Sequence, residues 1–348
     1  PRARGAIKHL VADGRFDYIE TGSLISIKNN VKNIMIPSEE HAIEMHPMDF
    51  EEFLWAMDDE LMMPFIKQHF EKRIPLGSFH RKALDYFRQY LIVGGMPQAV
   101  DKFVKTRDLE KVDEIKRDIL ALYRNDIKKY AESQELKVSA IFDEIPSQLQ
   151  KHEKKFRLSA LSDGARMRDY EDAFFWLSDA KIINCCYNST EPSIGLRLNE
   201  ERTTLKCYMG DTGLLVSLAF DERGEGQELY KKLLLGKLEV NEGMIVENVV
   251  AQMLRAAGHK LYFYSNSSRI SSEDRMEIDF LIAKDKITSR HNISPIEVKS
   301  GRHYSLTSLK KCILKYANQI SIPYVLHDKD LSEKEGILYL PLYMTPLL

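Results

Sequence analysis

The sequence of 348 residues has little cysteine, almost no net charge and no long apolar run. The formal net charge of −2 excludes a global electrostatic attraction to nucleic acid or to an anionic membrane surface, so any basic surface is expected to be local. No C-x-x-C spacing and no zinc-type histidine pattern occurs, which argues against a zinc site. The cysteines are therefore predicted to be buried thiols: Cys185, Cys186, Cys207 and Cys312.

No apolar stretch approaches the length of a membrane span, since even the run from Leu214 to Phe220 is far too short. The beginning of the sequence lacks the pattern of a signal peptide. We therefore expect a cytoplasmic protein without a membrane partner. The chain starts with Pro1 rather than methionine, so we expect that an N-terminal segment precedes it. Its length predicts two or three domains.

The most informative pattern lies in two predicted strands, 276–282 and 295–300. Asp279 lies in the first strand, and Glu297 and Lys299 lie in the second. Because side chains alternate across a strand, Glu297 and Lys299 point to one face. If the strands pair as a hairpin, Asp279 can lie beside Glu297. Two converging carboxylates are hard-oxygen ligands for Mg²⁺ or Mn²⁺, and a nearby lysine could hold a phosphate or polarise a water molecule.

The same three charges could instead be an ordinary exposed set on an edge hairpin. Two unit charges at 4 Å interact by about 4 kcal/mol at an effective dielectric constant near 20. Facing carboxylates without a metal ion would therefore repel each other. We expect one of them to have a raised pKa or to pair with Lys299.

The arrangement of Asp279 with Glu297-x-Lys299 resembles the PD-(D/E)xK nuclease superfamily, in which a helix glutamate precedes the hairpin. Glu247, in the predicted helix 242–254, is the matching candidate. The resemblance implies that Asp279 and Glu297 hold Mg²⁺ and that Glu247 assists through a water molecule. It also implies that Lys299 stabilises the charge that develops on the phosphorane.

A wider resemblance is to the prokaryotic AAA-type ATP-binding proteins that carry domain of unknown function 4143. It is carried by five short phrases, at residues 13–16, 21–23, 48–54, 94–97 and 208–215. The resemblance implies that Thr21 and Ser23 form a sensor of the ATP γ-phosphate at the end of a central strand, whereas the residues alone favour a simple turn. No Walker A loop occurs. ATP is thus expected as a cofactor only of the complete protein, with its binding loops upstream of Pro1.

Residues 156–177 have the pattern of a short helix, a glycine turn and a longer helix, as in a helix-turn-helix. Two alternating segments, 182–187 and 205–209, follow like the strands of a wing. Acidic residues on the second helix favour the alternative of a winged helix that binds protein. A local basic patch nonetheless offers candidate contacts to nucleic-acid phosphates: Arg157, Arg166 and Arg168.

The sequence as a whole predicts an α/β protein in four parts. These are the end of a P-loop ATPase core (1–75), a helical region or lid (76–148), a winged-helix-like domain (149–225) and a C-terminal restriction-endonuclease-like α/β domain (226–348). The leading hypothesis is the C-terminal part of an AAA-type ATP-binding protein with a Mg²⁺-dependent nuclease-like domain that acts on nucleic acid. The alternative is a non-catalytic module that binds a partner or nucleic acid. A homo-oligomer is a candidate assembly, and the substrate stays open.

Overall fold

The computed structural model describes residues 9–19, 41, 43–151, 153–193, 195–220, 230, 232, 234, 242–267, 273–283, 291–301 and 304–348. The sensor candidates Thr21 and Ser23 lie outside these residues. The α-helices are α3 (Phe50–Ala56), α4 (Met62–Lys72), α5 (Ser78–Val93), α6 (Pro97–Thr106), α7 (Leu109–Tyr130), α8 (Glu135–Gln150), α9 (Met167–Asp179), α10 (Thr212–Ala219), α12 (Glu242–Ala256) and α13 (Thr307–Lys315). The strands are β1 (Ile183–Ser189), β2 (Glu200–Met209), β3 (Tyr262–Asn266), β4 (Met276–Ala283), β5 (Ile293–Val298), β6 (Tyr324–His327), β7 (Ser332–Lys334) and β8 (Ile337–Pro341).

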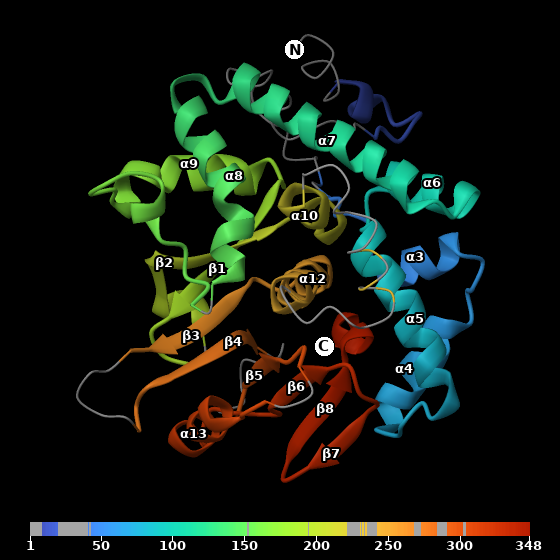
Figure 1. Cartoon of the computed structure of the whole chain (residues 1–348), viewed down its shortest axis with the longest axis vertical. Coiled ribbons are helices and arrows are strands. Elements are labelled where there is room, and N and C mark those ends of the chain that lie inside the picture. Colours follow the sequence, from blue (N-terminus) through green and yellow to red (C-terminus); the bar gives the residue numbers. More distant parts are fainter. Residues whose placement is uncertain are drawn as a thin grey trace.

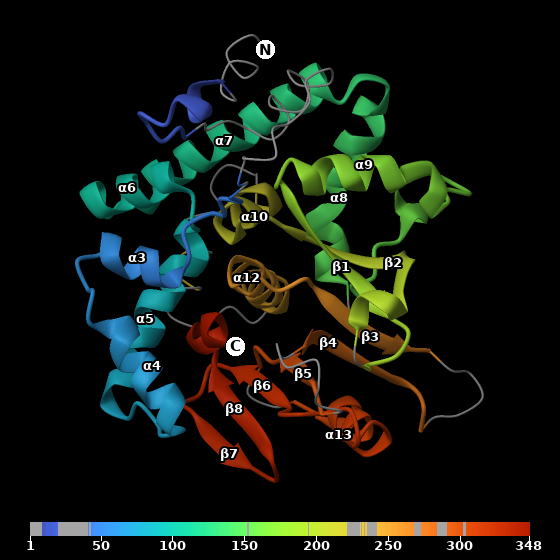
Figure 2. The ribbon, with the colours of Figure 1, turned by 180° about the vertical axis from the view of Figure 1, so that it is seen from behind.

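These strands form one eight-stranded mixed sheet in the order β2-β1-β3-β4-β5-β6-β8-β7. The β3-β4-β5 segment is antiparallel, whereas β1 pairs parallel to β3 and β6 pairs parallel to β5 and β8. The chain is therefore a mixed α/β structure, as the sequence predicts. Figures 1 and 2 show α12 at the centre of the molecule, between the helical layer and the sheet.

The segment expected to be a winged helix differs from that expectation in two ways. Its two strands pair as an antiparallel hairpin, but β1 also pairs with β3, so both belong to the same sheet as β4 and β5. The expected boundary between residues 225 and 226 therefore falls within one sheet. The expected short helix is only a 3₁₀ turn at Leu158–Ala160. The backbone just before this turn is hydrogen-bonded to other segments. Phe156 N–H donates to the carbonyl of Leu205, and Arg157 N–H donates to the side chain of Gln148.

Two apolar cores hold the layers together. The larger core joins the helices, including Phe87 and Leu91 of α5, to one face of the sheet, where Phe280 and Ile296 project. The smaller core lies between the opposite face of the sheet and α13, and it contains Leu281 together with residues of α13. The alternation of side chains along β4 and β5 therefore distributes apolar residues to both faces.

Several helix boundaries follow from local chemistry. Asp49 caps α3 in a reciprocal capping box with Glu52. Asp211 caps α10 by accepting a hydrogen bond from Leu214 N–H. Gly94 ends α5 with φ of 79°, and Pro97 starts α6. Within the part of the chain that the structure describes, no helix is long and apolar enough to cross a membrane.

Candidate carboxylate and lysine site

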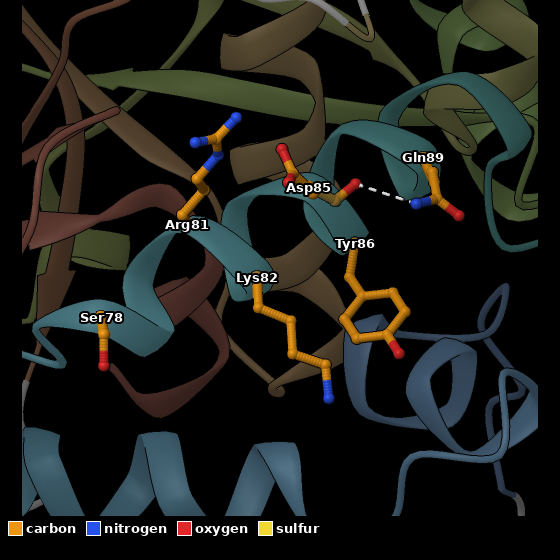
Figure 3. Close-up of a pocket in the computed structure, with 6 residues that line it drawn as sticks. All are labelled: Ser78, Arg81, Lys82, Asp85, Tyr86 and Gln89. Atoms are coloured by element: carbon orange, nitrogen blue, oxygen red, sulfur yellow. Dashed lines mark hydrogen bonds between the residues drawn. The ribbon is translucent and has the colours of Figure 1, made fainter.

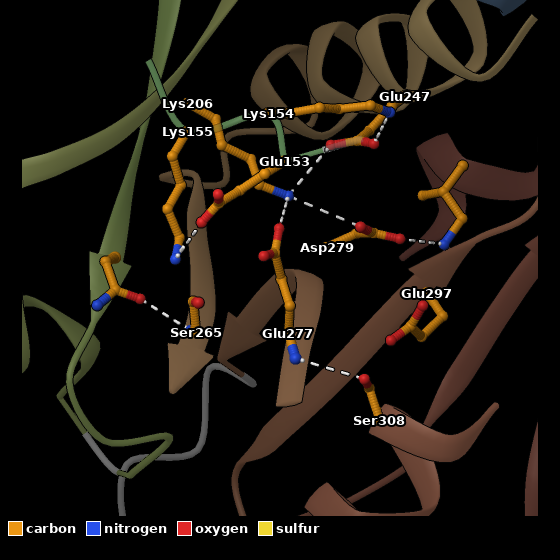
Figure 4. A network of polar contacts seen from close by, with 12 residues as sticks. Glu153, Lys154, Lys155, Lys206, Glu247, Ser265, Glu277, Asp279, Glu297 and Ser308 are labelled. Atoms are coloured by element: carbon orange, nitrogen blue, oxygen red, sulfur yellow. Dashed lines mark hydrogen bonds and ion pairs between the residues drawn. The ribbon is translucent and has the colours of Figure 1, made fainter. Parts of the chain in front are cut away.

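The predicted site residues come from helix α12 and from strands β4 and β5, which lie below it. Glu247 lies on α12, Asp279 on β4 and Glu297 on β5, and Lys299 directly follows β5. Strands β4 and β5 pair antiparallel with Phe280 opposite Ile296, so the expected hairpin pairing is confirmed. Figure 4 shows Asp279 and Glu297 on these neighbouring strands, with Glu247 on the helix above them.

A β-bulge positions the Asp279 carboxylate. Tyr262 pairs with Leu281 and Tyr264 pairs with Ile278, so β4 has one residue more than β3 in this interval, and the extra residue falls at Asp279 or its neighbour Phe280. Bulges re-aim a side chain and end regular pairing. Asp279 lies where the ladder between β4 and β5 ends, and its Oδ2 accepts a hydrogen bond from Val298 N–H at 2.8 Å. The bulge thus places this carboxylate where the two strands separate.

Lys206 of β2 lies at the centre of the cluster with only 1% of its side chain exposed. Its Nζ lies 3.1 Å from Glu277 Oε1, 3.3 Å from Glu247 Oε1 and 3.7 Å from Asp279 Oδ1. The ammonium also lies 5.1 Å from the centre of the Phe263 ring. Burial disfavours the charged form, but the three carboxylates outweigh it and raise the pKa of Lys206 well above its usual value. Lys206 is therefore a buried cation shared by three acids (Figure 4).

Glu247 is the most strongly stabilised anion of the cluster. Lys154 Nζ contacts its Oε2, and the Tyr208 hydroxyl donates to its Oε1. Lys154 also donates to the carbonyl of Gly243 at 3.1 Å. Burial raises the pKa of this carboxyl, but Lys154, Lys206 and Tyr208 together lower it to about 2. Glu247 is thus ionised at neutral pH.

Glu297 has the opposite electrostatic character. Its Oε2 accepts a hydrogen bond from Lys299 Nζ at 2.6 Å, whereas its buried Oε1 has no hydrogen-bond partner. Burial and the neighbouring Asp279 raise the pKa of Glu297 to about 8, against the pull of Lys299. Burial and Glu247 likewise raise the pKa of Asp279. Both expectations for facing carboxylates are therefore met, because a pKa is raised and an acid pairs with Lys299.

The donor set fits a magnesium site made by two carboxylates. Mg²⁺ is usually bound by one or two protein carboxylates, with water and substrate phosphates completing its shell. Asp279 and Glu297 supply such a pair, and the unpartnered Oε1 of Glu297 is a hard-oxygen acceptor without a donor. Among the described residues no group of three or more acids, histidines or cysteines is arranged to hold a metal ion. The two-carboxylate magnesium site therefore stays a prediction.

The three predicted phosphate contacts lie on the surface of one region. Arg157 pairs with Glu153 at 2.7 Å, and Arg168 lies 3.6 Å from Asp169. Arg166 is exposed at the start of α9 and takes part in no ion pair that the structure describes. The same basic segment contains Lys154, which reaches the acidic cluster. Lys154 therefore adjoins the site, whereas two of the three predicted arginines, Arg157 and Arg168, are already paired with acids.

Sequence reasoning missed Lys206 and Glu277. Glu277 precedes Asp279 by two residues, and strand alternation alone would have placed both on one face. Lys206 and Tyr208 alternate with apolar residues in β2, and a lysine inside a buried strand is an unusual feature that could have marked it. Its partners, however, lie 41 or more residues away in the chain.

Two surface hollows lie apart from the cluster. One, of about 350 Å³, is lined on α5 by Arg81, Lys82 and Tyr86 among others, and the Gln89 side chain there donates to the carbonyl of Asp85 (Figure 3). The other, of about 210 Å³, is lined by Lys181, Arg255 and residues of β1 and β3. None of the cluster carboxylates lines either hollow.

Comparison with known proteins gives two family matches. Residues 84–224 match a domain of unknown function, DUF8612, and residues 242–344 match a second domain of unknown function, DUF4143. No curated protein and no solved structure matches the chain. Lys206 thus belongs to the first matched segment, and the four carboxylates belong to the second. The C-terminal segment that carries Glu247, Asp279, Glu297 and Lys299 matches the DUF4143 domain that the sequence phrases predicted.

Proposed function

We propose that the cluster is a nuclease-like site that acts on the phosphodiester backbone of nucleic acid with the help of Mg²⁺. The observation that carries this proposal is the convergence of Asp279, Glu297 and Lys299 where β4 and β5 separate, beneath Glu247 of α12. A charged set on an exposed edge hairpin would not be buried in this way, and Glu297 is only 3% exposed.

Each residue has a role that follows from its surroundings. Asp279 and Glu297 would hold the metal ion, because they lie on paired neighbouring strands and Glu297 Oε1 has no hydrogen-bond partner. When bound, Mg²⁺ supplies Lewis-acid stabilisation of charge on a phosphoryl oxygen. Lys299 is partly exposed and can contact a phosphate. Glu247, ionised and fixed by Lys154 and Tyr208, would orient a water molecule.

The proposed substrate class is nucleic acid because basic side chains adjoin the acids. Lys154 contacts Glu247, and Arg157 lies three residues further along the same segment. Arg166 and Arg168 extend the positive surface at the start of α9. Phosphate contacts of this kind position a nucleic acid without reading its sequence.

An ATPase activity of the complete protein is also a proposal, and it rests on the family resemblance alone. The Thr21 and Ser23 candidates lie outside the described residues, and no Walker A loop occurs in the chain. In this proposal the chain supplies the nuclease-like module of an ATP-binding protein.

The test is cleavage of single- and double-stranded DNA and RNA in Mg²⁺ or Mn²⁺, with EDTA as the metal-free arm. We expect Asp279→Ala and Lys299→Ala each to lower the cleavage rate by at least a hundredfold. Lys310→Ala is the matched control, because Lys310 forms an exposed pair with Glu335. Circular dichroism establishes that every variant is folded. Absence of metal-dependent cleavage by the folded wild-type protein would refute the proposal.

A second candidate function is a non-catalytic module that binds nucleic acid or a partner protein. The observation that favours it is the position of Lys206, whose buried ammonium already lies within ion-pair distance of three carboxylates. In this case the wild-type protein retards nucleic acid in a gel-shift assay, or binds a partner, without cutting. The affinity is then insensitive to EDTA and to Asp279→Ala.

A further inference from the structure

Lys206 differs from the other lysines of the cluster in where it comes from and in how it is held. It lies on β2, within the segment that matches DUF8612, whereas its three carboxylate partners lie in the segment that matches DUF4143. Lys154 and Lys299 are partly exposed and can rotate away, but Lys206 is almost completely buried. The cluster is therefore completed by a cation that the C-terminal segment does not contain.

The cluster depends on this cation for charge balance. Four carboxylates (Glu247, Glu277, Asp279 and Glu297) meet three ammonium groups (Lys154, Lys206 and Lys299). Removing Lys206 would leave four acids with two lysines in a buried region. Such an excess of buried negative charge must be relieved by a bound cation, by protonation or by unfolding.

We propose that the Lys206 ammonium is an internal competitor of a divalent cation for the carboxylate of Asp279. The inference rests on the proposed function, because it takes Asp279 to be a metal ligand. An ammonium group and Mg²⁺ or Mn²⁺ both seek carboxylate oxygens, and at Asp279 Oδ1 they cannot both lie within contact distance without repelling each other. Lys206 is in this account a positioning residue that sets metal affinity, and β2 is the element through which the first matched segment controls the second.

The experiment measures Mn²⁺ and Mg²⁺ affinity by titration calorimetry for wild type, Lys206→Met and Lys206→Arg. We expect Lys206→Met to bind Mn²⁺ at least tenfold more tightly than wild type, and Lys206→Arg to stay within about threefold of it. We also expect Mn²⁺ to raise the melting temperature of Lys206→Met more than that of wild type, because a ligand that binds only the folded state stabilises it. Lys310→Met is the matched surface control.

A double variant keeps the test decisive if Lys206→Met does not fold. Lys206→Met with Glu277→Gln removes one charge of each sign and leaves Asp279 and Glu247 intact. It is expected to show a smaller gain in Mn²⁺ affinity in the same direction. A folded variant that binds Mn²⁺ no more tightly than wild type, with no additional thermal stabilisation by the metal ion, would overturn the inference.

The outcomes separate this inference from the proposed function. Metal-dependent cleavage by wild type together with unchanged Mn²⁺ affinity in the Lys206 variants refutes the competition and leaves the nuclease proposal standing. A gain in Mn²⁺ affinity without cleavage by any form supports the competition and refutes the nuclease proposal. If no form binds Mn²⁺, the competition is refuted, and the cleavage assay alone then decides the function.

Discussion

Helix α12 takes part in two buried polar networks that differ in how their hydrogen bonds are made. Glu247 belongs to the charged cluster of acids and lysines, whereas Asn248 and Gln252 belong to a network around Asp211. Both lie in the interior, and both join α12 to the segment 84–224. They differ in how their hydrogen-bonding groups are satisfied.

The Asp211 network is bonded in large part to backbone groups. Asp211 accepts hydrogen bonds from Gly95 N–H at 2.6 Å and from Leu214 N–H at 2.9 Å. The Asn248 side chain accepts a hydrogen bond from the backbone of β2 and donates one to it. The Gln252 side-chain oxygen accepts a hydrogen bond from the backbone N–H at the start of α10. Because backbone groups cannot rotate away, this arrangement is rigid and has the form of a structural joint.

The charged cluster instead relies on flexible lysine side chains and leaves an acceptor unpaired. Glu297 Oε1 has no partner, and the pKa values of Glu247 and Glu297 are displaced in opposite directions, to about 2 and about 8. Perturbed and divergent pKa values concentrate at functional sites. The comparison indicates that the Asp211 network is a structural joint, and the unpaired acceptor of Glu297 agrees with the proposal of a reactive site in the charged cluster.

The largest expected effect is in the structural joint. Asp211→Asn replaces one acceptor oxygen by an amide donor. This donor would face Gly95 N–H or Leu214 N–H, whose hydrogen bonds to Asp211 are both buried, and that N–H would lose its acceptor. We expect the free energy of unfolding to fall by about 4 kcal/mol, measured by urea denaturation. The matched control is Asp163→Asn, an exposed turn position. An Asp211→Asn protein as stable as that control would show that the network is not a joint.

Divalent cations sharpen the contrast between the two regions. Mn²⁺ should not restore the stability lost in Asp211→Asn, because the network offers backbone donors and no excess of carboxylates. In the Lys206→Met protein, by contrast, the same ion replaces a missing positive charge. Equal responses of both variants to Mn²⁺ would remove the proposed distinction.

A smaller effect is expected from pH. The pKa of Glu297 is raised to about 8 in the folded protein from an ordinary value of 4.5, so the folded state keeps a proton that the unfolded chain releases. Stability from this group is complete below about pH 4.5 and is lost as the pH rises toward 8, with a slope of up to about 1.4 kcal/mol per pH unit. Glu247 acts in the opposite sense, since its contribution is present above about pH 4.5 and is lost as the pH falls toward 2.

Glu297→Gln isolates the contribution of Glu297. We expect wild type to lose about 2 kcal/mol more stability than this variant between pH 5.5 and 7.5, measured by urea denaturation at each pH. Glu333→Gln, on the exposed strand β7, controls for the loss of a glutamate elsewhere. Parallel pH dependences for wild type and Glu297→Gln would contradict the raised pKa.

The sequence predicted the hairpin part of the site because that part is local. Asp279 and Glu297 lie on consecutive strands, so alternation and antiparallel pairing are sufficient to bring them together. Lys206 could not be placed in this way. It reaches the site because β1 pairs parallel to β3, and this long-range pairing joins segments that no local pattern connects.

The same limit explains the fold. The α/β class, the capped starts of α3 and α10 and the break between α5 and α6 follow from local residues. The 3₁₀ turn at Leu158–Ala160 in place of a helix does not follow from local residues, and Phe156 N–H just before it is bonded to the carbonyl of Leu205 in a distant strand.

The smallest effect on stability is expected at the surface arginines. Arg166 is exposed and has no ion-pair partner among the described residues, so Arg166→Ala should change the free energy of unfolding by less than about 0.5 kcal/mol. If it contacts a phosphate, its loss should weaken binding to DNA of any sequence. The slope of the logarithm of affinity against the logarithm of salt concentration should then fall by about 0.9 for duplex DNA.

Arg168→Ala should weaken binding less than Arg166→Ala, because Arg168 already lies near Asp169 and that partner offsets part of its charge. Arg81→Ala removes an exposed arginine from the hollow on α5 and serves as the control. Fluorescence anisotropy over a range of salt concentrations measures all three. If Arg166→Ala and Arg81→Ala bind DNA with the same affinity and the same salt slope, nucleic acid does not contact the start of α9. The phosphate contacts of the proposal would then have to come from the basic side chains beside Glu247.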